Sequence, residues 1–169
     1  MKRVEAIIVL VLLTAACQAE PNPEAKALAD ARDVERVEAA HNAAPPIAML
    51  SPQPIDYADI EKNNLFGASC SFRPEGSGGS YVALAMDEAA YLKIEGALHV
   101  YAADKGSPPL PFGARTRYEG REHVIDLQTA GGEGTPSGEE TVDWPGRLTI
   151  RDPQERVVYT SAGTVQCGA

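Results

Sequence analysis

The residues of this chain that could catalyse a reaction or bind a metal are few and widely spaced. The chain has three histidines: His41, His99 and His123. No two of them stand at the spacing of a zinc site, and no Cys-x-x-Cys accompanies them. Ser137 lies in a Gly-rich stretch and lacks the Gly-x-Ser-x-Gly pattern of a hydrolase nucleophile. We therefore predict no enzyme activity, no cofactor and no metal site; a metal bridging His99 and His123 across two strands is the alternative.

The N-terminal residues have the order of a secretory signal. A basic start is followed by the unbroken apolar run 6–13 and by the small residues 14–16, so we predict a signal peptide at residues 1–16. The apolar run is shorter than the stretch of about 20 residues that crosses a bilayer. A buried helix is the alternative interpretation.

The first cysteine directly follows this leader. Leu13-Thr14-Ala15-Ala16-Cys17 resembles the lipobox of bacterial lipoproteins, which implies that Cys17 is diacylated and becomes the mature N-terminus. Gln18 at the next position is compatible with the periplasmic face of the outer membrane. Ordinary cleavage after Ala16 or Ala19 is the alternative, and it would give a soluble periplasmic protein.

Two cysteines remain, Cys70 and Cys167. In an oxidising envelope two leftover thiols usually pair, so we predict a Cys70–Cys167 disulfide that encloses most of the C-terminal half. A reactive thiol at Cys70 is the alternative.

The chain is acidic, with a formal net charge of −9. Removal of residues 1–16, which carry a net +1, leaves −10. Such a surface repels phosphate backbones, so we predict no nucleic-acid partner. A cationic protein partner is favoured, although acidic surfaces often serve solubility alone.

Residues 17–54 are predicted to form a lipidated, partly helical spacer that ends in a Pro-rich linker. Asn22 can cap a helix that has Pro23 at its first position, and Pro45-Pro46 end the pattern. The apolar stripe is thin, which predicts a solvated helix; a coiled coil is the alternative.

A short helix is predicted next, at the start of a β-domain over residues 55–169. Asp56 and Asp59 have the spacing of a capping box, and Ile55 can pack on Ile60. Asn63-Asn64 end the helix, which we expect to plug one end of the following domain.

The rest of the chain alternates between short apolar runs and turn residues, which predicts a mainly β fold. About eight strands indicate a small antiparallel barrel or sandwich. Tight turns are predicted at Glu95-Gly96 and, with Pro153 in second place, at 152–155. Alternation predicts these inward-facing residues: Leu84, Leu92, Ile94, Leu98, Val100, Ile125, Leu127, Leu148, Ile150 and Val158.

Residues 70–167 resemble the membrane-bound inhibitors of c-type lysozyme, which are periplasmic lipoproteins with a small antiparallel barrel. The elements that carry the resemblance come in the family's order: Cys70, Ala90, Leu92, Gly96, Gly113, Ala114, Arg115, Tyr118, Gly120, Trp144 and Cys167. The resemblance implies that the first and last cysteines pair. It also implies that the loop containing Phe112, Gly113, Ala114, Arg115, Arg117 and Tyr118 contacts a partner.

The chain departs from that family at the loop. The family's inhibitory serine falls on Phe112, Thr116-Arg117 are inserted before Tyr118, and residues 130–141 form an extra loop. A phenyl ring cannot donate the serine's hydrogen bond, so a structural turn is the alternative role for this loop. The sequence thus predicts a non-enzymatic envelope lipoprotein with a protein-binding β-domain and lysozyme as a candidate partner. A carrier of a small apolar ligand and a structural or assembly role are the alternatives.

Overall fold

The computed structural model describes residues 22–169. The predicted signal peptide and Cys17 lie outside the described residues. The described residues divide into two units, with the boundary between Pro45 and Pro46. Within the described part, no helix has both the length and the apolarity to cross a bilayer.

The first unit contains α1 (Pro23–Asn42), a helix held by local interactions. The Asn22 side chain accepts a hydrogen bond from the Glu24 backbone N–H at 3.0 Å, and Pro23 occupies the first turn. Arg36 pairs with Asp33 at 2.8 Å one turn away. Every residue of α1 is exposed. The predicted helix is therefore present, with its N-terminal cap and the Arg36–Asp33 pair as internal support.

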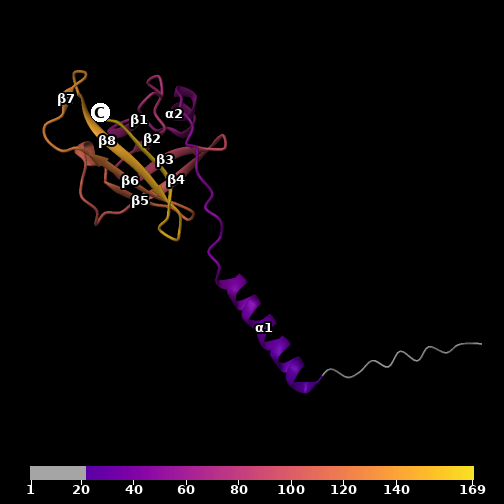
Figure 1. Ribbon diagram of the computed structural model, residues 1–169. Helices are drawn as coiled ribbons and strands as arrows, with labels where there is room; N and C mark the ends of the chain where they lie inside the picture. Colours follow the sequence, from indigo (N-terminus) through magenta and orange to yellow (C-terminus); the bar gives the residue numbers. More distant parts are fainter. Residues whose placement is uncertain (1–21) are drawn as a thin grey trace, which may run out of the picture. The chain divides into compact units, whose positions relative to one another are not determined.

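The second unit is a closed antiparallel barrel of eight strands with one short extra strand (Figure 1). The barrel order is β1–β2–β3–β4–β5–β6–β8–β9, and pairing of β9 with β1 completes the circle. The short β7 pairs with β8 outside this circle. The strands are β1 (Ser69–Pro74), β2 (Ala83–Ala85), β3 (Ala89–Ile94), β4 (Ala97–Ala103), β5 (Arg117–Glu119), β6 (Val124–Thr129), β7 (Thr135–Pro136), β8 (Thr141–Arg151) and β9 (Val157–Gly168). The predicted mainly β fold is confirmed, and of its two forms the barrel is the correct one.

Side chains fill the barrel interior. The largest fully buried ones come from every side of the barrel: Phe72, Leu92, Tyr118, Ile125, Leu127, Leu148, Ile150 and Val165. Seven of the predicted inward residues belong to this core: Leu92, Ile94, Ile125, Leu127, Leu148, Ile150 and Val158. An eight-stranded barrel has an interior just wide enough to be filled in this way.

Three predicted inward residues were assigned to the wrong face. Val100 is 62% exposed, while its neighbour Tyr101 is 2% exposed and belongs to the core. Leu98 and Leu84 belong to a second cluster on the outer side of the wall. The side chains of a strand point alternately to its two faces. An error of one residue in the alternation of β4 therefore assigns every side chain of that strand to the wrong face.

This outer cluster is formed by α2 (Tyr57–Asn63) and its flanking residues. Asp56 and Asp59 make the predicted capping box, and Asn64 ends the helix in a left-handed conformation. Ile55 and Leu65 on either side of α2 pack with Leu84 of β2. The helix therefore covers the outer wall, and the expectation that it plugs one end of the domain was wrong.

The segment before α2 also belongs to the barrel unit. Backbone N–H groups of Leu50, Gln53 and Ile55 donate to carbonyl oxygens of Val158, Lys93 and Tyr81 at 2.7–2.9 Å. The compact unit therefore begins at Pro46, whereas the sequence placed the domain boundary at residue 55.

Both predicted turns are present. Glu95 and Gly96 have φ values of 50° and 80° and join β3 to β4, the two positive values that a type I′ hairpin turn requires. At the β8–β9 turn, the Glu155 N–H donates to the Asp152 carbonyl at 2.9 Å. The Asp152 carboxylate accepts from Gln154 and Arg156 backbone N–H groups, both at 2.9 Å. Together with the Arg156 side chain, these bonds outweigh burial and lower the pKa of Asp152.

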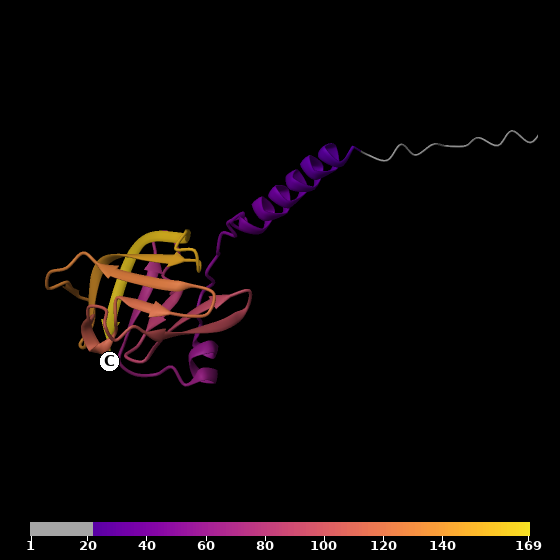
Figure 2. The same ribbon diagram turned by 90° about the horizontal axis from the view of Figure 1, so that it is seen from below.

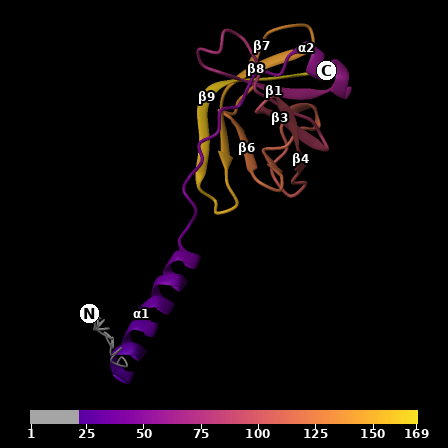
Figure 3. The same cartoon turned by 90° about the vertical axis from the view of Figure 1, so that its right-hand side faces the viewer.

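The two longest strands, β8 and β9, bend along one side of the barrel (Figures 2 and 3). Gly146 and Gly163 stand directly opposite each other in this pair. A Cβ atom on Gly163 would collide with the Arg73 carbonyl and lie 2.9 Å from the Phe72 ring. Glycine at this position is therefore required by the close approach of β1 and β9, which closes the barrel.

Candidate functional site

The two distal cysteines form a disulfide. Cys70 of β1 and Cys167 of β9 are direct cross-strand partners, both fully buried, and their sulfur atoms are bonded. The bridge spans a sequence separation of 97 residues. It therefore fixes covalently the same strand pair that closes the barrel.

The loop singled out by the family resemblance is mostly structural. Ala114 and Tyr118 are fully buried. The Tyr118 hydroxyl accepts from the Arg115 N–H and donates to the Met86 carbonyl, both at 2.7 Å. Burial raises the pKa of Tyr118. These bonds fix the loop against the barrel. The buried Tyr118 ring is therefore not part of an exposed surface.

The side chains of the two arginines in this loop also interact with other residues of the protein. Arg115 Nη1 donates to the Lys105 and Ser107 carbonyls at 3.4 and 3.3 Å. Arg117 pairs with Glu119 and Asp126 at 3.2 and 3.3 Å, and these carboxylates raise its pKa.

Phe112 is the exception in the loop. It lies in the short 3-10 helix η1 (Pro111–Gly113), and its ring is 40% exposed. Its φ is 56°, in the left-handed region that a bulky residue rarely adopts. Of the predicted loop residues, Phe112 is therefore the one whose large side chain is presented to solvent.

His99 and His123 line a common polar cavity of about 220 Å³ with Tyr101, Gly120 and Glu122. His99 shares the inward face of β4 with Tyr101, since Leu98 and Val100 face outward. Within residues 22–169 there is no group of three His, Cys, Asp or Glu residues placed to hold a metal. Burial raises the pKa of Tyr101 to about 12.

We expect His123→Gln to reduce the loss of stability on acidification. Burial and the charge of His99 lower the pKa of His123 below its usual 6.5, against the opposing effect of Glu122. The unfolded chain therefore takes up this proton first as the pH falls below about 7. The stability lost in this way grows until the lower folded-state pKa is passed and stays constant below it. Urea unfolding at neutral and mildly acidic pH should show a smaller difference for H123Q than for wild type. His41→Gln, in the exposed α1, is the matched control; an unchanged pH dependence in H123Q would contradict the assignment.

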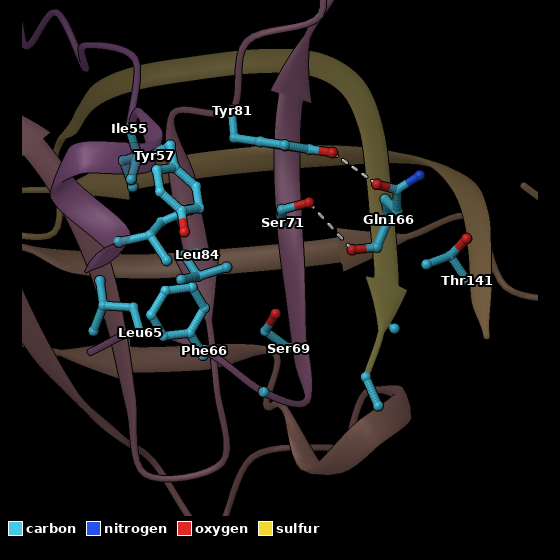
Figure 4. A pocket seen from close by; sticks show the side chains of 14 residues that line it. Ile55, Tyr57, Leu65, Phe66, Ser69, Ser71, Tyr81, Leu84, Thr141 and Gln166 are labelled. Atoms are coloured by element: carbon cyan, nitrogen blue, oxygen red, sulfur yellow. Dashed lines mark hydrogen bonds between the residues drawn. The ribbon is translucent and has the colours of Figure 1, made fainter. Parts of the chain in front are cut away.

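An apolar groove lies outside the barrel, and we call it the outer groove (Figure 4). It has a volume of about 300 Å³. Its residues come from α2 and its flanks, from β1 and β2, and from the ends of β8 and β9: Ile55, Tyr57, Ile60, Leu65, Phe66, Gly67, Ser69, Ser71, Tyr81, Leu84, Thr141, Gln166, Gly168 and Ala169.

The groove exists because its floor is made of small residues. Ser69 and Ser71 alternate with Cys70 and Phe72, which face the core, so the serines face outward beneath the groove. Gly168 of β9 adds no side chain beside them. Large side chains from α2 stand on one side of this floor, and the end of β9 lies on the other (Figure 4).

Two aromatic rings form the exposed wall. Tyr57 and Phe66 are 67% and 53% exposed, and their ring centroids lie 6.2 Å apart in an edge-on arrangement. The α2 segment is fixed by its capping box and by Lys93, whose Nζ lies 2.6 Å from Asp59 Oδ2. That hydrogen bond lowers the pKa of Asp59 and raises that of Lys93. The α2 segment beside the two rings is therefore fixed, while the rings themselves remain exposed to solvent.

The opposite wall is polar and rigid. The Tyr81 hydroxyl donates to Gln166 Oε1 at 2.8 Å, and Gln166 Nε2 donates to Asp143 Oδ1 at 2.8 Å. Arg73 pairs with Asp143 at 3.1 Å and lies 5.4 Å from the centroid of the Tyr81 ring. The Arg73 guanidinium thus already contacts both Asp143 and the Tyr81 ring.

A second hollow adjoins the groove and shares Thr141 and Ala169 with it. This second hollow, the acidic hollow, has a volume of about 460 Å³ and is lined by Phe112, Pro136, Gly138, Glu139, Glu140, Thr141, Val142 and Ala169. Among the described residues lining the two hollows there is no Lys, Arg or His. The surface combines exposed aromatic side chains with negative charge and has no internal counter-charge in its lining.

Sequence reasoning found parts of this surface without joining them. It singled out Phe112 and the extra loop at residues 130–141, and it found the helix that carries Tyr57. The signal available for the groove was a pair of bulky aromatic residues, Tyr57 at the start of the short helix and Phe66 just after its end.

Comparison of the chain with protein-family models, with curated proteins and with solved structures finds no match in any of the three.

Proposed function

We propose that this chain is a non-enzymatic lipoprotein of the bacterial cell envelope whose barrel binds a protein partner at the outer groove. The leader and Cys17 support the lipid anchor and a position on the periplasmic face of the outer membrane. The observation that supports binding is the pair of exposed rings, Tyr57 and Phe66, beside a floor of small residues. Exposed aromatic side chains around a hollow are the type of anchor that dominates protein–protein binding energies.

The chemistry of the groove suits binding rather than catalysis. Its described lining offers aromatic and aliphatic side chains, hydroxyls and one amide, with no imidazole or carboxylate side chain beside them. The side chains that most often act as general acid or base, those of His, Asp, Glu and Lys, are therefore missing from the lining given by residues 22–169.

A carrier of a small apolar ligand is the alternative proposal, and it too would use the outer groove. The barrel interior, where such a ligand would otherwise lie, is occupied by Phe72, Leu92, Tyr118 and their neighbours. The groove's volume of about 300 Å³ is at the lower limit for small-molecule sites, and its open form favours a protein surface.

A cationic protein is the proposed partner class, with c-type lysozyme as the candidate to test first. The net charge of −9 for the whole chain gives long-range attraction toward a basic protein. The family resemblance of residues 70–167 supports lysozyme in particular. Since Phe112 replaces the family's inhibitory serine, we expect binding with little inhibition of the enzyme.

The test is the affinity of oxidised residues 18–169 for c-type lysozyme at low ionic strength, measured by calorimetry. The double variant Tyr57→Ala/Phe66→Ala should bind at least about tenfold more weakly, because loss of a hot-spot aromatic residue costs about 2 kcal/mol or more. The matched control, Val100→Ala/Val157→Ala, removes exposed apolar side chains outside the groove lining and should leave affinity unchanged. Intact mass of the protein recovered from membranes reports whether Cys17 carries lipid.

Two outcomes would contradict the proposal. Absence of any lysozyme binding removes lysozyme as the partner, and equal binding by the groove and control variants removes the groove as the site. A small apolar fluorophore that binds in a Tyr57-dependent manner, without protein binding, would favour the carrier alternative.

A further inference from the structure

We infer that the outer groove and the acidic hollow together recognise one kind of partner segment: a bulky apolar side chain followed within a few residues by Lys or Arg. This inference rests on the proposed function and specifies the chemistry of the partner.

The first step is that the two hollows form one surface. Thr141 and Ala169 line both of them, and Thr141 lies opposite Gly168 in the register of β8 and β9. A segment whose apolar side chain enters the groove beside Tyr57 and Phe66 can therefore continue across Thr141 into the acidic hollow. One chain can contact both sites without leaving the surface.

The second step is that Glu139 and Glu140 are available to a partner. Both are exposed, and no ion pair joins either of them to a cation in residues 22–169. The nearby carboxylates differ in this respect, since Asp143 is paired with Arg73 and Asp59 with Lys93. The charge left for a partner on this surface therefore comes from the glutamate pair.

The third step is that the turn carrying these glutamates is held in place. The Ser137 N–H donates to the Thr141 carbonyl at 2.9 Å, which closes a tight turn around them. The Ser137 hydroxyl donates to Asp143 Oδ1 at 2.7 Å, and Trp144 Nε1 donates to the Gly132 carbonyl at 3.1 Å. When the carboxylates bind a cation, a backbone that is already fixed loses less conformational entropy than a mobile loop would.

The fourth step is that charge and apolar contact act together. An exposed ion pair alone contributes little in water, so the acidic pair selects a partner only when the apolar contact holds a cation beside it. The apolar contact in turn discriminates poorly among segments, and repulsion by the glutamates would reject acidic ones. Specificity thus requires both hollows.

Synthetic peptides test this directly. Acetyl-Gly-Trp-Gly-Lys-Lys-Gly-amide is the probe, with one control peptide carrying Ala for Trp and another carrying Glu-Glu for Lys-Lys. Binding to residues 18–169 is followed by calorimetry up to about 1 mM peptide. We expect the Trp–Lys–Lys peptide to bind, and each control to bind at least about tenfold more weakly.

Two double variants that change the net charge by the same amount show which glutamates cause the preference for lysine over glutamate. Glu139→Gln/Glu140→Gln should abolish most of the preference for lysine over glutamate. Glu75→Gln/Glu95→Gln, which neutralises two exposed glutamates outside both hollows, should preserve it. The preference should also weaken with added salt, because these charges are exposed.

The inference is overturned if the Trp–Lys–Lys peptide does not bind by about 1 mM, if the lysine and glutamate peptides bind equally, or if the two double variants behave alike. Such a result leaves the proposed function standing when Tyr57→Ala/Phe66→Ala still weakens lysozyme binding. When Tyr57→Ala/Phe66→Ala also has no effect on lysozyme binding, both this inference and the proposed function are contradicted.

Discussion

Removal of the Cys70–Cys167 disulfide is expected to lower the free energy of unfolding by about 4 to 5 kcal/mol. The bridge spans 97 residues, and in the chain-entropy model a loop of this length restricts the unfolded chain by about that amount. Most of the barrel's strands lie within the loop. The measurement is urea unfolding of Cys70→Ala/Cys167→Ala against oxidised wild type, both as residues 18–169.

Reduced wild type is the control for this prediction. It lacks the bond and retains both sulfur atoms in the core, so it separates the covalent constraint from the packing of the side chains. A loss below about 1 kcal/mol in both proteins would mean that the unfolded chain is already restricted by residual structure. That outcome would contradict the entropic account.

Gly163→Ala is expected to destabilise the barrel by about 3 kcal/mol, at the upper end of the usual cost of overpacking. The new methyl group would collide with the Arg73 carbonyl and lie 2.9 Å from the buried Phe72 ring. A backbone carbonyl cannot move aside by changing rotamer, so β1 and β9 would have to separate where they close the barrel. Urea or thermal unfolding measures the effect.

Gly106→Ala is the matched control. Neither glycine has a positive φ, and the nearest contact of a new Cβ at Gly106 is the Asp104 carboxylate at 3.2 Å, the end of a side chain that can rotate. We expect a change within about 0.5 kcal/mol there. Equal effects at the two positions would show that loss of glycine flexibility, rather than the collision with Arg73, sets the cost.

The local features of the fold could be predicted because each depends on a few neighbouring residues. The capping box of Asp56 and Asp59 and the Glu95-Gly96 turn are determined within four residues of sequence. The closing disulfide followed from the number of cysteines and the expected compartment. The number and shortness of the strands predicted a barrel or a sandwich and did not distinguish between the two.

The face of β4 could not be predicted, because both of its faces carry apolar residues. Leu98 faces the outer cluster, whereas Tyr101 faces the core. The alternation of β4 fits either choice of inward face equally well. Only the packing of α2 on the outer wall shows which choice is correct. Alternation identifies an inward face only where the other face is in water.

The groove was missed for a related reason. Its residues come from three separated parts of the chain, which only barrel closure brings together. The floor residues Ser69, Ser71 and Gly168 are small and carry no motif. Conversely, the loop around Tyr118 was predicted to contact a partner, yet Tyr118 serves to hold that loop against Met86.

If the protein is exported as proposed, the position of the disulfide would link export to readiness for binding. Cys70 lies between the floor residues Ser69 and Ser71, and Cys167 lies between Gln166 and Gly168, which line the same groove. The sulfur–sulfur bond is thus directly beneath the surface on which the proposed partner would lie. In a thiol-rich cytoplasm the newly made polypeptide would lack this cross-link, and its docking surface would rest on non-covalent pairing alone. Oxidation after translocation would therefore act as a maturation step, giving full affinity only in the compartment where the partner is met.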